Sequence, residues 1–135
     1  MTTSATLLTL ESDPTRLGDL QSRVDALCRD AGLEAVAANE FTTAIIEAVA
    51  NSIRHGYRGE PGHPITVHWR CAQDRIDIEI RDRAPPPPAG FLDHRDMPPP
   101  AAESGRGVAM ILAYTDAASY ARIGAENVLN LTRRL

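Results

Sequence analysis

Residues 65–82 contain two stretches in which apolar and polar side chains alternate. The first reads ITVHWRC and the second reads RIDIEIRD, and only the three residues AQD separate them. Alternation with a period of two predicts a β-strand that has one buried and one solvated face. The short link predicts that the two strands pair as a hairpin. Because its apolar face must be covered, this hairpin requires other elements packed against it.

Two stretches with helical periodicity precede the hairpin and can supply that cover. One begins after the Ser-Asp-Pro sequence at 12–14, which favours a helix start, and ends near Gly32. Its apolar residues recur at helical intervals: Leu17, Leu20, Val24 and Leu27. The other runs from about Glu34 to Tyr57, and one apolar stripe along it is expected to pack on the sheet: Ile45, Val49 and Ile53.

The remaining segments complete a single expected domain, residues 1–135. TLLTL near the start predicts a first strand, and residues 105–115 predict a short helix that begins with glycine. Residues 117–123 and 128–135 predict a second hairpin joined by GAEN. This order predicts an α+β fold, a two-layer sandwich in which a mainly antiparallel mixed sheet is covered on one face by helices.

Residues 83–104 show little periodicity and hold seven of the ten prolines of the chain. Proline stiffens local segments but supplies no packing pattern, so this stretch predicts a long loop. Loops of this length inside compact domains are usually functional lids or disordered segments.

The overall charge argues against two classes of partner. A net charge of −4, a pI near 5.5 and scattered arginines argue against nucleic acid or an anionic membrane. The start of the chain lacks the basic region of a signal peptide, and no run approaches the roughly 20 apolar residues that span a bilayer. Cys28 and Cys71 have no metal-ligand spacing, so we expect buried, reduced cysteines in a cytoplasmic protein.

The second predicted helix carries Glu47, Asn51 and His55 at steps of four, which places them along one side of the cylinder. Two interpretations are open: a solvated polar face, or a face turned toward a ligand. A solvated face would more often carry Lys and Glu in ion-pairing steps. This chain has no lysine, and small residues flank Glu47 and Asn51.

Asp82 ends the second alternating strand on the same face as its isoleucines. An unpaired carboxylate on the core side is costly. Either the strand ends at Arg81 and Asp82 begins a turn, or a ligand group donates hydrogen bonds to the carboxylate. An exocyclic amine on an otherwise apolar ring would suit it.

The sequence SGRGVAMI places Gly105 and Gly107 around Arg106 at an expected helix start. Backbone N–H groups can converge there on an anion, with help from the helix dipole, and the arginine can add a charged contact to phosphate. Most Gly-x-Gly sequences are simple turns, but here the motif follows a long loop and opens a helix.

Together, EAVANSIRHGY, RDRAPP and SGRGVAMI resemble the motifs of the GHKL ATPase superfamily, which has the Bergerat fold. The resemblance is strongest to the bacterial branch of anti-sigma factors with serine-protein kinase activity. It implies that ATP or ADP binds between helices and sheet and that Mg²⁺ bridges the phosphates. By position, it implies that Glu47 is the catalytic base, Asn51 the Mg²⁺ ligand and Asp82 the carboxylate that reads adenine. The other nucleotide-binding residues that it implies are His55, Ala84, Gly105, Arg106, Gly107 and Val108.

The resemblance also implies partners. They are a sigma factor, which the protein would hold inactive, and an anti-sigma-factor antagonist of the STAS type, which it would phosphorylate on a serine. A homodimer is implied as well, and the loop at 83–104 would be a nucleotide lid. One departure from the family pattern leaves a second function open. Asp82 is followed by Arg83, Ala84 and Pro85 where the family usually has glycines. A nucleotide-binding or purely steric anti-sigma module with little kinase activity is therefore the alternative. A histidine kinase catalytic domain is disfavoured because no dimerisation helix pair is present in the sequence.

Overall fold

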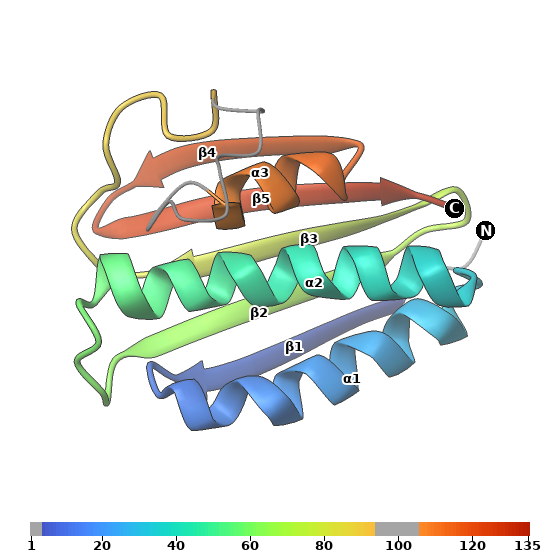
Figure 1. Cartoon of the computed structure of the whole chain (residues 1–135), viewed down its shortest axis with the longest axis horizontal. Helices are drawn as coiled ribbons and strands as arrows, with labels where there is room; N and C mark the ends of the chain where they lie inside the picture. The colour runs from blue at the N-terminus through green and yellow to red at the C-terminus, as the bar shows by residue number, and fades with distance from the viewer. Residues whose placement is uncertain (1–3, 94–105) are drawn as a thin grey trace.

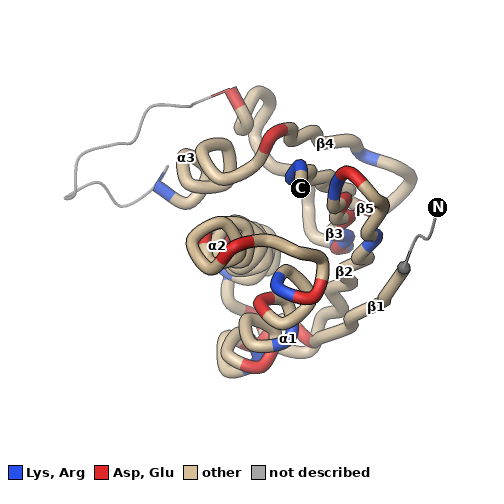
Figure 2. Tube along the Cα trace, turned by 90° about the vertical axis from the view of Figure 1, so that its right-hand side faces the viewer, with Lys and Arg blue, Asp and Glu red and all other residues tan. Residues whose placement is uncertain are grey.

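The computed structural model describes residues 4–93 and 106–135 and forms two layers, a five-stranded sheet and three helices that cover one face of it (Figure 1). The order along the chain is β1 (Ser4–Glu11), a 3-10 turn (Pro14–Arg16), α1 (Leu17–Asp30), α2 (Ala35–Asn51), a π-helical turn (Ser52–Gly56), β2 (Pro64–Cys71), β3 (Arg75–Asp82), α3 (Arg106–Ala113), β4 (Ala117–Ile123) and β5 (Glu126–Arg134). The predicted α+β sandwich is confirmed. Seen from the side, the helices lie together on one side of the strands (Figure 2).

The sheet has the strand order β1-β2-β3-β5-β4, and its four pairings are antiparallel. A mixed sheet was expected, yet no parallel pair occurs among the described strands. The topology gives the reason. β4 follows β3 through the crossover helix α3 and runs in the same direction as β3, but β5 lies between these two strands.

The core lies between the sheet and the helices, as the two periodicities predict. The isoleucines of β3 and the apolar residues Ile65, Val67 and Trp69 of β2 are at most 2% exposed. The apolar stripe of α2 and the following π-helical turn faces them, with Ile45, Val49 and Ile53 all buried. Hydrophobic burial on this one face holds the layers together.

Two boundaries differ from those expected, and both differences bear on the candidate site. The long helix changes from α to π geometry after Asn51 and ends at Gly56. The last hairpin has a turn of only Gly124 and Ala125, and Gly124 has a φ of +60° that favours glycine. β5 therefore begins at Glu126, two residues before the expected position.

The stretch from residue 83 is irregular, as predicted, up to residue 93. The rest of the predicted lid, residues 94–104, lies outside the described residues, as does Gly105. Among the helices that the structure describes, none is long and apolar enough to cross a membrane.

The two cysteines differ in their surroundings. Cys28 is fully buried beside Thr42, as expected, whereas Cys71 is only partly buried because it is the last residue of β2. Burial raises the pKa of the Cys28 thiol to about 11. Little thiolate, the nucleophilic form, is therefore present at pH 8.

We expect a thiol reagent at pH 8 to modify Cys71 readily in the native protein and to leave Cys28 unmodified until the protein unfolds. Mass spectrometry after timed exposure measures this directly. The variant Cys71→Ser is the control and should show no early modification. Early modification of Cys28 in that variant would contradict the buried placement.

Candidate nucleotide-binding site

A pocket of about 880 Å³ opens between the end of α2, the start of α3 and the lid-side ends of the central strands. Its lining brings together seven of the residues singled out from sequence: Glu47, Asn51, His55, Asp82, Arg106, Gly107 and Val108. They come from three segments that are far apart in the chain. The structure therefore joins the three motifs in one cavity.

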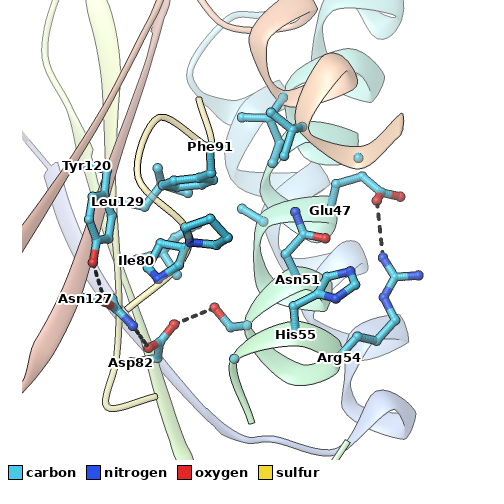
Figure 3. Close-up of a pocket in the computed structure, with 18 of the residues that line it drawn as sticks. Glu47, Asn51, Arg54, His55, Ile80, Asp82, Phe91, Tyr120, Asn127 and Leu129 are labelled. Carbon is cyan, nitrogen blue, oxygen red and sulfur yellow. Dashed lines mark hydrogen bonds and ion pairs between the residues drawn. The ribbon is translucent and has the colours of Figure 1, made fainter. Parts of the chain in front are cut away.

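The α2 side of the pocket carries the polar stripe. Figure 3 shows Asn51 between Glu47 and His55, with its side chain directed into the pocket. Arg54, two helical turns after Glu47, forms an ion pair with it at 3.8 Å between Nη2 and Oε2. Two interpretations of this side of the helix were open, a solvated polar face and a face turned toward a ligand. Its place in the lining of the pocket fits the second one better.

Gly107 lies very close to this stripe. A Cβ atom at this position would be 2.9 Å from Oε2 of Glu47 and 3.4 Å from Oδ1 of Asn51. The first turn of α3 therefore contacts both side chains, and it approaches Glu47 so closely that a side chain larger than glycine would displace the Glu47 carboxylate. The start of α3 and the polar stripe thus form one small cradle.

This cradle suits a hard cation only if a bound nucleotide supplies most of the oxygens that coordinate the ion. Among the described residues, no cluster of three or more His, Cys, Asp or Glu side chains is placed to hold a metal ion. The Asn51 amide is a suitable oxygen donor at the cradle. Mg²⁺ commonly binds to one or two protein oxygens together with phosphates and water, so these residues fit such an ion in the presence of a nucleotide.

Asp82 lies at the opposite end of the pocket from Glu47 (Figure 3). It belongs to β3 and is 8% exposed, so the alternative in which the strand ends at Arg81 is wrong. Its Oδ2 accepts a hydrogen bond from the Ser52 hydroxyl at 2.7 Å, and its Oδ1 accepts one from the Ala84 N–H at 3.0 Å and one from Nδ2 of Asn127 at 2.7 Å. Hydrogen-bond donors of the protein therefore already occupy part of the acceptor capacity of this carboxylate.

Ala84 contributes differently from the other predicted residues. It is buried and does not line the pocket. Its N–H binds Asp82, and a Cβ at Gly56 would lie 2.9 Å from the Ala84 Cβ. The proline-rich segment thus leaves the sheet in direct contact with the end of the π-helical turn.

Several lining residues were not identified from the sequence. Asn127 and Tyr120 form a hydrogen-bonded pair near Asp82, and an apolar wall consists of Ile80, Phe91 and Leu129 (Figure 3). The Phe91 and Tyr120 rings meet edge to face at 5.2 Å. A signal for Asn127 does exist, because it alternates with Leu129 and Leu131. The expected strand start at 128 concealed it.

A family model described as "Histidine kinase-like ATPase domain" matches residues 10–133. The chain belongs to this family. The match includes all three helices, β2–β4 and β5 up to Arg133, together with the complete pocket lining. The resemblance to the GHKL superfamily is thereby confirmed.

Relatives of this ATPase domain carry names that point to one branch. The chain is 46% identical over 43 residues to an anti-sigma F factor of Oceanobacillus iheyensis, a match covering 32% of this chain and 30% of that protein. It is 31% identical over 52 residues to the serine-protein kinase RsbW of Listeria innocua, covering 38% of this chain and 33% of the relative. These matches thus span about a third of the relatives' length.

The fold has a counterpart among solved structures. A crystal structure of the RsbU and RsbW domains of a Mycobacterium tuberculosis protein covers 98% of this chain and 32% of that one, with a TM-score of 0.65 and 18% sequence identity. At this identity the likeness shows the fold, and it is the fold expected for an ATPase domain of this kind.

Proposed function

We propose that this protein is an anti-sigma factor and an ATP-dependent serine-protein kinase. It would hold a sigma factor inactive and would transfer the γ-phosphoryl group of ATP to a serine of an anti-sigma-factor antagonist. The observation that carries the proposal is one pocket with an acid and an amide beside the start of α3 and a buried carboxylate at its other end. The names of the relatives support the choice of partners.

The nucleotide would lie along the pocket with its base at the Asp82 end. The apolar wall of Ile80, Phe91 and Leu129 suits a flat ring, and Asp82 can accept a hydrogen bond from the exocyclic amine of adenine. The phosphates would then reach the cradle at Gly107, where backbone N–H groups at a helix start favour an anion. Arg106 also lines the pocket and adds positive charge there.

Asn51 would hold Mg²⁺, which neutralises phosphate charge when it is bound with the nucleotide. Glu47 lies one helical turn away from Asn51, next to the same cradle. Glu47 would accept the proton of the serine hydroxyl while the serine oxygen bonds to the γ-phosphorus and the bond to the ADP oxygen breaks. Arg54 holds the Glu47 carboxylate at this edge of the pocket.

The setting is part of the same proposal, and the names of the relatives support its choice of a sigma factor as partner. We propose a cytoplasmic protein that forms a homodimer and exchanges between the sigma factor and an antagonist of the STAS type. Sigma-factor binding would use surface outside the pocket, so the two activities would be separable by substitution.

One observation favours a second candidate, a binding module with little or no kinase activity. Asp82 is followed by Arg83, Ala84 and Pro85 in place of glycines, and Tyr57 accepts a hydrogen bond from the Arg83 N–H at 2.7 Å. This contact holds the root of the loop against the helix end, and a restrained loop would close less readily over ATP.

Incubation of the protein with labelled ATP, Mg²⁺ and the antagonist tests the proposal. We expect one serine of the antagonist to become phosphorylated and ADP to accumulate in equal amount, and chelation of Mg²⁺ to stop both. ATP binding and sigma-factor capture without any phosphoserine would support the binding module. No nucleotide binding at all would contradict the kinase and the nucleotide-binding module and would leave only a purely steric anti-sigma module.

A further inference from the structure

We propose that Asn127 is a positioning residue that orients Asp82 toward the exocyclic amine of the base and so sets the preference for adenine over hypoxanthine nucleotides. This inference rests on the proposed function, because it deepens the base-binding end of the same pocket. It concerns a residue on the last strand, 45 positions from Asp82 in the sequence.

The sheet places the two residues opposite each other. In the antiparallel pairing of β3 with β5, Asp82 is the direct partner of Asn127. Side chains of directly opposed residues project to the same face of the sheet and lie close enough to interact. Both residues are 8% exposed and both line the pocket.

Five hydrogen bonds fix the Asn127 amide. Its Nδ2 donates to Asp82 Oδ1 at 2.7 Å, to the Ala84 carbonyl oxygen at 3.0 Å and, at 3.4 Å, to the Pro85 carbonyl oxygen. Its Oδ1 accepts from the Tyr120 hydroxyl at 2.5 Å and from Nη1 of Arg122 at 2.9 Å. A carboxylate or carbonyl oxygen can only accept and a guanidinium can only donate. The amide therefore has a single orientation that satisfies all its partners.

This orientation decides which part of Asp82 remains available to a ligand. A carboxylate has about four acceptor positions, two on each oxygen. The Ala84 N–H and the Asn127 amide fill both positions of Oδ1, and Ser52 fills one position of Oδ2. The remaining position belongs to Oδ2, and it accepts an amine but repels the carbonyl oxygen that hypoxanthine carries in place of the amine.

Without the Asn127 amide, Asp82 would lose this arrangement. Oδ1 would keep only the Ala84 N–H, the carboxylate could rotate, and a donor from solvent or from a different base edge could replace the amide. Discrimination between bases would fall more than general affinity for nucleotides, because the contacts to the phosphates lie elsewhere in the pocket.

The test compares the dissociation constants of ADP and inosine diphosphate, measured by calorimetry. The two ligands differ only on the base edge that Asp82 is proposed to read, where adenine has an exocyclic amine and an N1 acceptor and hypoxanthine has a carbonyl and an N1–H donor. We expect the parent protein to prefer ADP by about tenfold or more, as for a hydrogen bond to a charged group. In Asn127→Ala and Asn127→Asp, which remove both donors, this ratio should fall at least about threefold. Asn130→Ala, on an exposed residue of the same strand, should keep the parent ratio.

Thermal unfolding of each variant shows whether it is folded. If the Asn127 variants do not fold, Tyr120→Phe decides the question, since it removes only the hydroxyl that donates to Asn127 and keeps the ring beside Phe91. It should lower the ratio by a smaller factor. An unchanged ratio in the folded variants would overturn the inference and leave the proposed function standing. A parent protein that binds ADP and inosine diphosphate equally would overturn the inference and the adenine assignment together.

Discussion

Replacement of Glu47 by alanine is expected to lower the rate of serine phosphorylation by at least about 100-fold, the contribution that a positioned general base typically makes. The Glu47 carboxylate lies at the cradle formed by Gly107 and Asn51, where the γ-phosphate and the incoming hydroxyl would meet. Its loss would remove the group that is proposed to take the proton in the transition state. The substitution does not remove a contact to the adenine ring of ATP, so the dissociation constant for ATP should change little.

The matched variants separate this role from a structural one. Glu40→Gln changes an acid seven residues earlier on α2, outside the pocket, and should phosphorylate the antagonist at nearly the parent rate. Asn51→Ala should lower both the rate and the ATP affinity, because the proposed metal ligand also helps to hold the phosphates. All three variants should still capture the sigma factor.

The measurement is the initial rate of phosphoserine formation with saturating ATP and Mg²⁺, together with the ATP dissociation constant. A Glu47→Ala variant that phosphorylates the antagonist as fast as the parent protein would show that this acid is only a helix-face residue. If the parent protein also forms no phosphoserine while sigma-factor binding persists, the binding module is the better description.

Replacement of Asp82 by asparagine is expected to weaken ADP binding by about 10-fold to 100-fold, which corresponds to the loss of one or two hydrogen bonds to a charged acceptor. The substitution keeps the shape of the side chain but leaves one oxygen where the structure has two. Ser52, Ala84 and Asn127 all donate to this carboxylate, so at least one of these donors would face an amide N–H group. The preference for adenine should fall with it.

Asp82 is buried, so its replacement also lowers the stability of the fold. A control variant must therefore separate a loss of ADP binding from a general loss of stability. Asp77→Asn is suitable because Asp77 lies on the same strand but on the opposite face, where it accepts from Thr132. It should reduce the melting temperature modestly and leave ADP binding unchanged. An Asp82→Asn protein that is folded and binds ADP with the parent affinity would exclude the adenine contact.

The sequence by itself predicted the layers of this protein and much of its candidate site. The alternation in β2 and β3 and the helical spacing in α2 are local patterns, and each assigns a face to every residue in its element. Asp82 could therefore be placed on the core side of β3, and Glu47 and Asn51 on one side of α2, before any contact was known. The motif at Gly107 was recognised in the same way, from its position before a helix.

The pairing of Asn127 with Asp82 and the wall containing Phe91 came only from the tertiary structure. A periodic pattern states which way a side chain points but not which residue lies opposite it. The register of β5 on β3 depends on a two-residue turn at Gly124 and on the crossover through α3, both outside the two strands. Because register is set by packing and turn geometry summed over the whole sheet, the partner of Asp82 was decided by the fold.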